Sequence, residues 1–115
     1  MARRSLLLVD DEKALVALLK RYLERQGHAV ETCGTAGEAL RLVRDRPEGF
    51  DLVMLDLGLP DRPGLEVLDE ILSAAPRVRV VIASGTPYES TNKRVSSLLK
   101  PFTPQMLEEA LEQGF

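Results

Sequence analysis

Five strand-like segments alternate with amphipathic segments along this chain, and this alternation limits the possible folds more than any other feature of the sequence. The strand-like segments are short and apolar, and they lie at residues 6–9, 29–33, 51–55, 78–83 and just before Lys100. Between them, apolar residues recur three and four positions apart, as an amphipathic helix requires. Strands that alternate with helices form a parallel sheet with helices on both faces. We therefore expect an α/β fold, a doubly wound (βα)5 sandwich with a parallel five-stranded sheet.

The apolar content of the strands indicates their order in the sheet. Residues 6–9 and 52–55 are continuously apolar, as strands that are buried on both faces are. Right-handed connections between parallel strands restrict the order further. The flavodoxin-like order 2-1-3-4-5 places the two most apolar strands in the middle, and we expect that order.

Residues that start and stop helices mark the ends of the amphipathic segments. Thr35 and Glu38 have the spacing of a capping box, and Thr103-Pro104 is an N-cap followed by proline at the first helical position. The expected stops are Gly27, Pro47, Pro76 and Gly114. The first helix, expected from Glu12 to Gln26, carries one apolar stripe, which consists of Leu15, Leu18, Leu19, Tyr22 and Leu23.

The connection between the fourth and fifth strands is too short for an ordinary helix. Ser84 and Lys100 are only 16 positions apart, and residues 85–95 must make the whole crossover. A crossover that includes its helix needs at least about 10–12 residues. This segment also has poor helix propensity, because it is rich in Gly, Pro, Ser, Thr and Asn. The fourth helix should be shortened or missing.

Length and composition indicate a single domain, which we place at residues 1–115. The net charge of −3 argues against direct contact with nucleic acid. No apolar run approaches the roughly 20 residues of a membrane span, and the first apolar run is too short for a signal peptide. The one cysteine, Cys33, cannot form an internal disulfide. We therefore expect a cytoplasmic domain without membrane contact.

Four charged residues directly follow strand-like segments: Asp10 and Asp11 follow the first, Asp56 the third and Lys100 the fifth. Asp10 and Asp11 alone could simply cap the next helix, where acidic side chains favour the positive end of the dipole. The carboxyl ends of parallel strands, however, meet at one edge of the sheet. Three carboxylates there would repel one another unless a cation lay among them. Mg²⁺ prefers such oxygen ligands, so we expect a divalent cation beside a phosphoryl group.

In these residues the chain resembles the receiver domains of two-component response regulators. The resemblance spans essentially the whole sequence, and its pieces occur in the expected order on the expected elements. They are Asp10-Asp11, Asp56, Pro60, Gly64, Ser84 and Lys100-Pro101-Phe102.

The resemblance implies a role for each of the site residues. Asp56 would accept a phosphoryl group from a phosphohistidine on a histidine kinase or a histidine phosphotransfer protein. Asp11, Asp56 and the backbone carbonyl of Gly58 would hold Mg²⁺, with Asp10 acting mostly through a bound water. Ser84 and Lys100 would contact phosphoryl oxygens. The peptide bond between Lys100 and Pro101 would be cis.

Two other functions are compatible with some of these residues. A phosphohydrolase-like enzyme with an aspartyl nucleophile usually has Asp-x-Asp after its first strand, whereas Asp10 and Asp11 are adjacent here. A binding module that has lost phosphorylation would not be expected to keep the full set of acidic residues, Ser84 and Lys100. We therefore expect a phospho-accepting signalling module and not an enzyme.

The chain departs from ordinary receivers in two places. Ser97 stands where the fifth strand usually carries an aromatic residue, and the crossover before it is short. Short crossovers that begin Ser-Gly and are followed by Lys-Pro-Phe resemble the receivers of hybrid histidine kinases. Dimerisation through the missing helix should be weak, so we expect a monomer.

Overall fold

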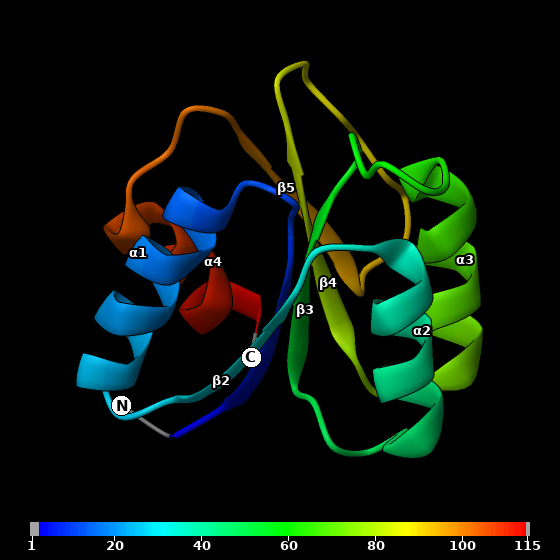
Figure 1. The fold of residues 1–115 in the computed structure, drawn as a ribbon, viewed down its shortest axis with the longest axis horizontal. Helices are drawn as coiled ribbons and strands as arrows, with labels where there is room; N and C mark the ends of the chain where they lie inside the picture. Colours follow the sequence, from blue (N-terminus) through cyan, green and yellow to red (C-terminus); the bar gives the residue numbers. More distant parts are fainter. Residues whose placement is uncertain (1–2, 115) are drawn as a thin grey trace.

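A five-stranded parallel sheet forms the centre of the computed structural model, which describes residues 3–114 (Figure 1). In chain order, the elements are β1 (Ser5–Val9), α1 (Lys13–Arg25), β2 (Ala29–Cys33), α2 (Ala36–Asp45), β3 (Leu52–Asp56), α3 (Gly64–Ala74), β4 (Arg79–Ser84), β5 (Val95–Leu99) and α4 (Pro104–Gly114). The strand order is β2-β1-β3-β4-β5, and every pair is parallel. The predicted fold class and strand order are therefore confirmed. Residues 1, 2 and 115, at the ends of the expected domain, lie outside the described residues.

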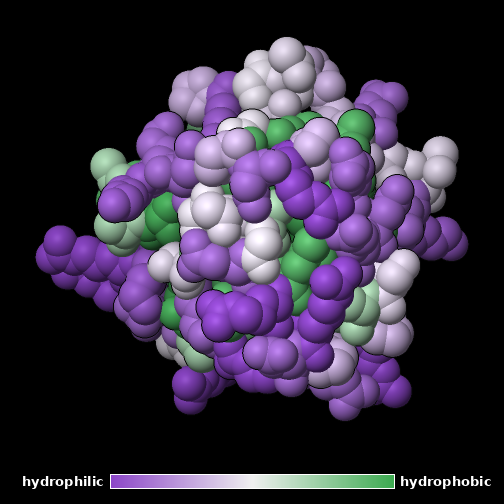
Figure 2. Space-filling view, turned by 45° about the vertical axis from the view of Figure 1, so that its right-hand side comes forward, coloured by the Kyte–Doolittle hydropathy of each residue, from purple (hydrophilic) through white to green (hydrophobic). Residues whose placement is uncertain are grey.

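Two hydrophobic cores lie on opposite faces of this sheet. Helices α2 and α3 cover one face, and α1 and α4 cover the other (Figure 1). Residues of β1 alternate between the cores: Leu7 and Val9 pack toward α2 and α3, whereas Leu6 and Leu8 pack toward α1 and α4. Every residue of β3 is buried, which explains why the central strands are continuously apolar. On the face shown in Figure 2, hydrophilic side chains cover most of the surface and apolar ones show only in small separate spots.

The predicted apolar stripe of α1 is wrong in one member. Leu19 and Leu23 are fully buried, but Leu18 is 55% exposed. Val16 is buried in its place. The inward stripe runs through residues 16, 19 and 23, and Leu18 lies beyond its edge on the helix.

The expected helix boundaries are largely confirmed by hydrogen bonds. The Thr35 hydroxyl accepts a hydrogen bond from the Glu38 amide at 3.2 Å, as an N-cap does. Gly27 follows α1 with a φ of 96°, a conformation that glycine adopts without strain. The Thr103 hydroxyl caps α4 by accepting from the Met106 amide at 3.2 Å. Within residues 3–114, no helix is both long enough and apolar enough to cross a membrane.

No helix forms between β4 and β5, as the short crossover predicts; residues 85–94 are extended or turned instead. Three contacts hold this segment in place. Tyr88 packs against the core of the α2–α3 face, and its carbonyl accepts a hydrogen bond from the Ser97 hydroxyl at 2.8 Å. The Arg94 guanidinium donates to backbone carbonyls of Leu72, Ala75 and Val78. Helix α4 packs on one face of the edge strand β5, but Val95 is the one residue of this strand that is buried.

Gly64 allows the first turn of α3 to lie directly on the end of β3. A Cβ at this position would lie 2.7 Å from Cα and 2.8 Å from Cδ2 of Leu57, and 3.2 Å from the carbonyl oxygen of Asp56. Two of these three atoms belong to the backbone and cannot rotate away. Any larger residue must therefore move α3 or the backbone beside Asp56.

We expect Gly64→Ala to lower the free energy of unfolding by about 1–3 kcal/mol, because overpacking forces backbone shifts. Gly85→Ala is the matched control, since a Cβ there meets nothing within 4 Å. Its effect should stay within about 0.5 kcal/mol. Urea unfolding of both variants measures the difference. Equal stabilities would show that the contact with Leu57 relaxes at little cost.

His28 is a buried structural residue at the start of β2. Its Nδ1 accepts a hydrogen bond from the Arg4 amide at 3.0 Å, which requires that nitrogen to be unprotonated. Burial lowers the pKa of His28, and Arg4 acts in the same direction; the carboxylates of Glu108 and Glu112 on α4 oppose the shift. The folded state therefore favours neutral imidazole.

Stability should consequently depend on pH through His28. Unfolded His28 has an ordinary pKa near 6.5, so below that pH the unfolded state binds more protons than the folded state. The contribution of neutral His28 to the free energy of unfolding is present above pH 6.5. It is lost as the pH falls toward the lower pKa of His28 in the folded state. Between pH 7.5 and 5.5 the wild type should lose more stability than His28→Asn, whose side-chain oxygen can accept from Arg4 without titrating. Parallel stability curves for the two proteins would contradict this role.

Candidate functional site

The sheet brings the charged strand ends together at one edge. Asp10 and Asp11 follow β1, Asp56 ends β3, and Lys100 follows β5. Strands β1 and β3 are neighbours, so their carboxyl ends lie side by side. Ser84, at the end of β4, pairs with Leu99 in the β4–β5 ladder. All of the predicted site residues therefore lie at the carboxyl edge, where parallel sheets bind ligands.

The three acidic side chains form one compact cluster. One carboxylate oxygen from each of Asp10, Asp11 and Asp56 lies within 4.8 Å of the other two. Asp10 and Asp56 are buried, whereas Asp11 is exposed to solvent. The Asp10 carboxylate accepts a hydrogen bond from the Glu12 amide at 2.9 Å, and that of Asp56 accepts from the Gly58 amide at 3.1 Å. Clustered carboxylate oxygens of this kind can hold a hard divalent cation.

Lys100 joins the two buried carboxylates. Its ammonium lies 2.9 Å from Oδ2 of Asp10 and 3.3 Å from Oδ1 of Asp56. Partial burial alone would disfavour the charged lysine, but the hydrogen bond and charge of Asp10, together with Asp56, raise the pKa of Lys100. The peptide bond to Pro101 is cis, as expected. The Lys100 amide also donates to the carbonyl of Ser84 at 2.8 Å, which ties the ends of β4 and β5 together.

The hydroxyl of Ser84 is engaged with the loop that follows β4. It lies 3.3 Å from the Thr86 hydroxyl and accepts a hydrogen bond from the Thr86 amide at 3.2 Å. Sequence reasoning singled out Ser84 but missed Thr86. Two hydroxyls only two positions apart after a strand end are a signal that could have pointed to this pair.

Asp61, in the loop after β3, was also missed. Its carboxylate accepts hydrogen bonds from the backbone amides of Ala36 at 2.9 Å and Gly37 at 3.0 Å, at the start of α2. These two bonds lower the pKa of Asp61. Its partners lie about 25 positions away in the sequence, so no local sequence pattern predicts these hydrogen bonds. In the same loop, Arg62 forms ion pairs with Glu66 and Glu70 of α3.

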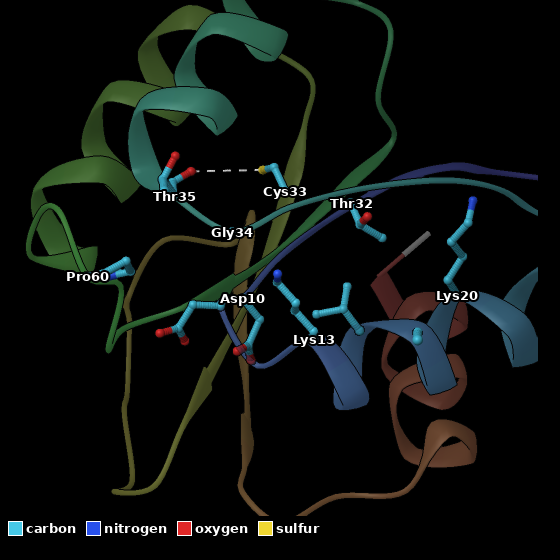
Figure 3. A pocket seen from close by; sticks show the side chains of 11 residues that line it. Asp10, Lys13, Lys20, Thr32, Cys33, Gly34, Thr35 and Pro60 are labelled. Atoms are coloured by element: carbon cyan, nitrogen blue, oxygen red, sulfur yellow. Dashed lines mark hydrogen bonds between the residues drawn. The ribbon is translucent and has the colours of Figure 1, made fainter.

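A cavity of about 550 Å³ opens beside the acidic cluster (Figure 3). Lys13 and Lys20 come from α1, Thr32 and Cys33 come from β2, and Pro60 comes from the loop after β3. Burial raises the pKa of Cys33 to about 12, so its thiol stays neutral and unreactive. The cavity gives a ligand room to approach the exposed Asp11 from the side of α1.

The ion pairs of Lys100 should contribute to stability. Lys100→Gln leaves the buried Asp10 carboxylate without its charged partner, and we expect a loss of about 1–3 kcal/mol in the free energy of unfolding. Lys20→Gln is the control, because Lys20 forms an exposed ion pair with Glu24. Its effect should be below about 1 kcal/mol. Thermal and urea unfolding of both variants give the comparison, and a Lys100→Gln protein as stable as wild type would contradict it.

Comparison with known proteins shows the family to which this chain is similar. The family model described as "Response regulator receiver domain" matches residues 6–112. The alginate biosynthesis transcriptional regulatory protein AlgB of Pseudomonas aeruginosa is 36% identical over 108 residues, which cover 89% of this chain and 24% of that protein. The chain thus spans about a quarter of the length of that regulator.

Solved structures of similar fold include receiver domains. The receiver domain from the hybrid histidine kinase CckA superposes with a TM-score of 0.85 at 27% identity, over 96% of this chain and 97% of that one. The response regulator TrrA of Thermotoga maritima, solved in complex with Mg²⁺-BeF, gives a TM-score of 0.83 at 26% identity, over 97% and 99% of the two chains. The family match covers nearly the whole sequence and the same fold recurs in these structures, so the chain belongs to the response regulator receiver domain family.

Proposed function

We propose that Asp56 is the residue that accepts the phosphoryl group in this receiver domain, and that the 115 residues form one such domain. The observation that supports this choice is the difference in access among the three clustered carboxylates. Lys100 contacts both Asp10 and Asp56, but the Asp10 side chain is 0% exposed, whereas that of Asp56 is 10% exposed. Asp11 is exposed. Asp56 therefore combines access for a phosphodonor with a cation beside the reacting oxygen.

The donor set of the cluster fits a magnesium ion. Asp11, Asp56 and the Gly58 carbonyl would hold it, and Asp10 would act through a bound water, since Mg²⁺ keeps several waters when protein ligands are few. Bound Mg²⁺ would neutralise charge on the phosphoryl oxygens and on the carboxylates. A residue larger than glycine at position 58 would place its Cβ 3.8 Å from both oxygens of Asp56, beside the reacting carboxylate.

The reaction is a transfer from nitrogen to oxygen. A carboxylate oxygen of Asp56 forms the new bond to phosphorus as the phosphorus–nitrogen bond of a phosphohistidine breaks. The electron pair of that bond returns to the histidine ring, which carries a proton on its other nitrogen and leaves as neutral imidazole. The Lys100 ammonium and the Ser84 hydroxyl contact the phosphoryl oxygens, and Ser84 must turn from Thr86 to do so. Positioning and charge stabilisation supply most of the catalysis in such a transfer.

The partner would be a histidine kinase or a histidine phosphotransfer protein. The helix-free crossover and the similarity to the CckA receiver support a receiver of the hybrid kinase type. The net charge of −3 supports a domain without direct nucleic acid or membrane contact. The free cysteine Cys33 fits a cytoplasmic location, where thiols stay reduced. We also infer a monomer, because residues 85–94 before the edge strand form no helix through which two copies could pair.

Phosphorylation can be tested with acetyl phosphate and Mg²⁺. Intact-mass spectrometry should show one added phosphoryl group on the wild type, and none on Asp56→Ala or after Mg²⁺ is removed with a chelator. Asp51→Asn is the matched control, because Asp51 flanks the opposite end of β3 and its side chain bonds the Ser5 amide. That variant should label like wild type.

Three results would each overturn part of the proposal. Equal labelling of Asp56→Ala would assign the acceptor to another residue. Continuous release of phosphate without a phosphoprotein would indicate a phosphohydrolase-like enzyme. A wild type that takes no phosphoryl group from acetyl phosphate or from a phosphohistidine donor would indicate a phosphorylation-silent binding module.

A further inference from the structure

The start of α2 is held from two directions. Thr35, the residue before the helix, accepts a hydrogen bond from the Glu38 amide. The amides of Ala36 and Gly37, which precede Glu38 in the helix, donate to the two carboxylate oxygens of Asp61. The first three amides of α2 are thus all satisfied, and a negative charge lies at the positive end of the helix dipole.

Asp61 belongs to the loop that carries Gly58. This loop runs from Leu57 to Pro63, between the end of β3 and the start of α3. At its beginning the Leu57 amide donates to the carbonyl of Ala83, and at its end Arg62 pairs with α3. Gly58 and Asp61 lie between these anchors and are exposed, whereas Leu59 between them is buried in the core on the α2–α3 face. Asp61 attaches this middle part of the loop to α2, an element outside the loop's own strand and helix.

A simple helix cap does not require this arrangement. Thr35 already provides a side-chain cap from within the sequence of α2. Asp61 reaches the helix from 24 and 25 positions away, so its bonds constrain two separate segments at once. Pro60, next to Asp61, and Gly34, just before α2, both line the cavity beside the acidic cluster. The bonds of Asp61 therefore fix the distance between two walls of that cavity.

We propose that Asp61 is a positioning residue for the divalent-cation site: by bonding the start of α2, it holds the loop so that the Gly58 carbonyl stays near Asp11 and Asp56. This inference rests on the proposed function, in which that carbonyl is a metal ligand. Groups that orient metal ligands commonly change metal affinity when they are removed, by 10–100-fold. Asp61 is three residues from Gly58 along the loop and is exposed, so we expect an effect at the lower end of this range.

The test compares substitutions of the two side chains that accept hydrogen bonds from the first amides of α2. Asp61→Ala releases the loop, whereas Thr35→Ala removes a cap of α2 and leaves the loop bonds intact. Mg²⁺ affinity is measured by NMR titration, followed at the Gly58 amide. We expect Asp61→Ala to weaken Mg²⁺ binding about 10-fold, and Thr35→Ala to leave it unchanged although both lower the melting temperature. Asp61→Asn should fall between, because an amide offers one acceptor oxygen for two amide donors.

A second measurement needs no metal. Hydrogen exchange of the Gly58 amide in the metal-free protein should be faster in Asp61→Ala than in wild type, and unchanged in Thr35→Ala. Equal Mg²⁺ affinity in Asp61→Ala and wild type would overturn the positioning role, as would an equal loss in Thr35→Ala. A wild type that shows no response to Mg²⁺ would instead overturn the proposed function, and this role with it.

Discussion

Two buried carboxylates, Asp10 and Asp56, lie at the ends of neighbouring central strands, and the rest of the site is arranged around their charges. Like charges about 4 Å apart repel by about 4 kcal/mol at an effective dielectric constant of 20. Burial adds a cost, because a carboxylate loses its hydration. Lys100 offsets both effects through contacts of 2.9 and 3.3 Å. It can reach both carboxylates only because β5, two strands from β3, ends at the same edge of the sheet.

The charges of these residues also explain why a divalent cation would have to bind at the site before an anionic phosphoryl group. Three carboxylates and one ammonium leave two negative charges, which would repel an approaching phosphoryl group. A divalent cation bound at Asp10, Asp11 and Asp56 would cancel that excess. In the proposed function, an anionic phosphoryl group would then approach Asp56 without net repulsion, and Lys100 would be free to turn toward it. In the proposed function, the same residues would serve stability in one state and phosphoryl transfer in the other.

The segment between β4 and β5 distinguishes this chain from receivers with a helix there. Ser97 occupies the position where related domains usually carry an aromatic residue, and its hydroxyl bonds the Tyr88 carbonyl of the crossover. The crossover is therefore attached to β5 and, through Arg94, to the carbonyls of Leu72 in α3 and Val78 just before β4.

The sequence determined the fold class, the strand order and the missing helix, because strand-length apolar runs, helical spacing and a short crossover are local properties. It also placed Asp10, Asp11, Asp56, Ser84 and Lys100 at one edge, since parallel strands share the direction of their carboxyl ends. Local spacing could not show which face of α1 packs against the sheet, so the expected buried stripe included Leu18, which is exposed. Nor could it show that Asp61 bonds α2 or that the Ser84 hydroxyl bonds Thr86. Those contacts depend on how loops pack once the sheet has assembled, and only the tertiary structure decided them.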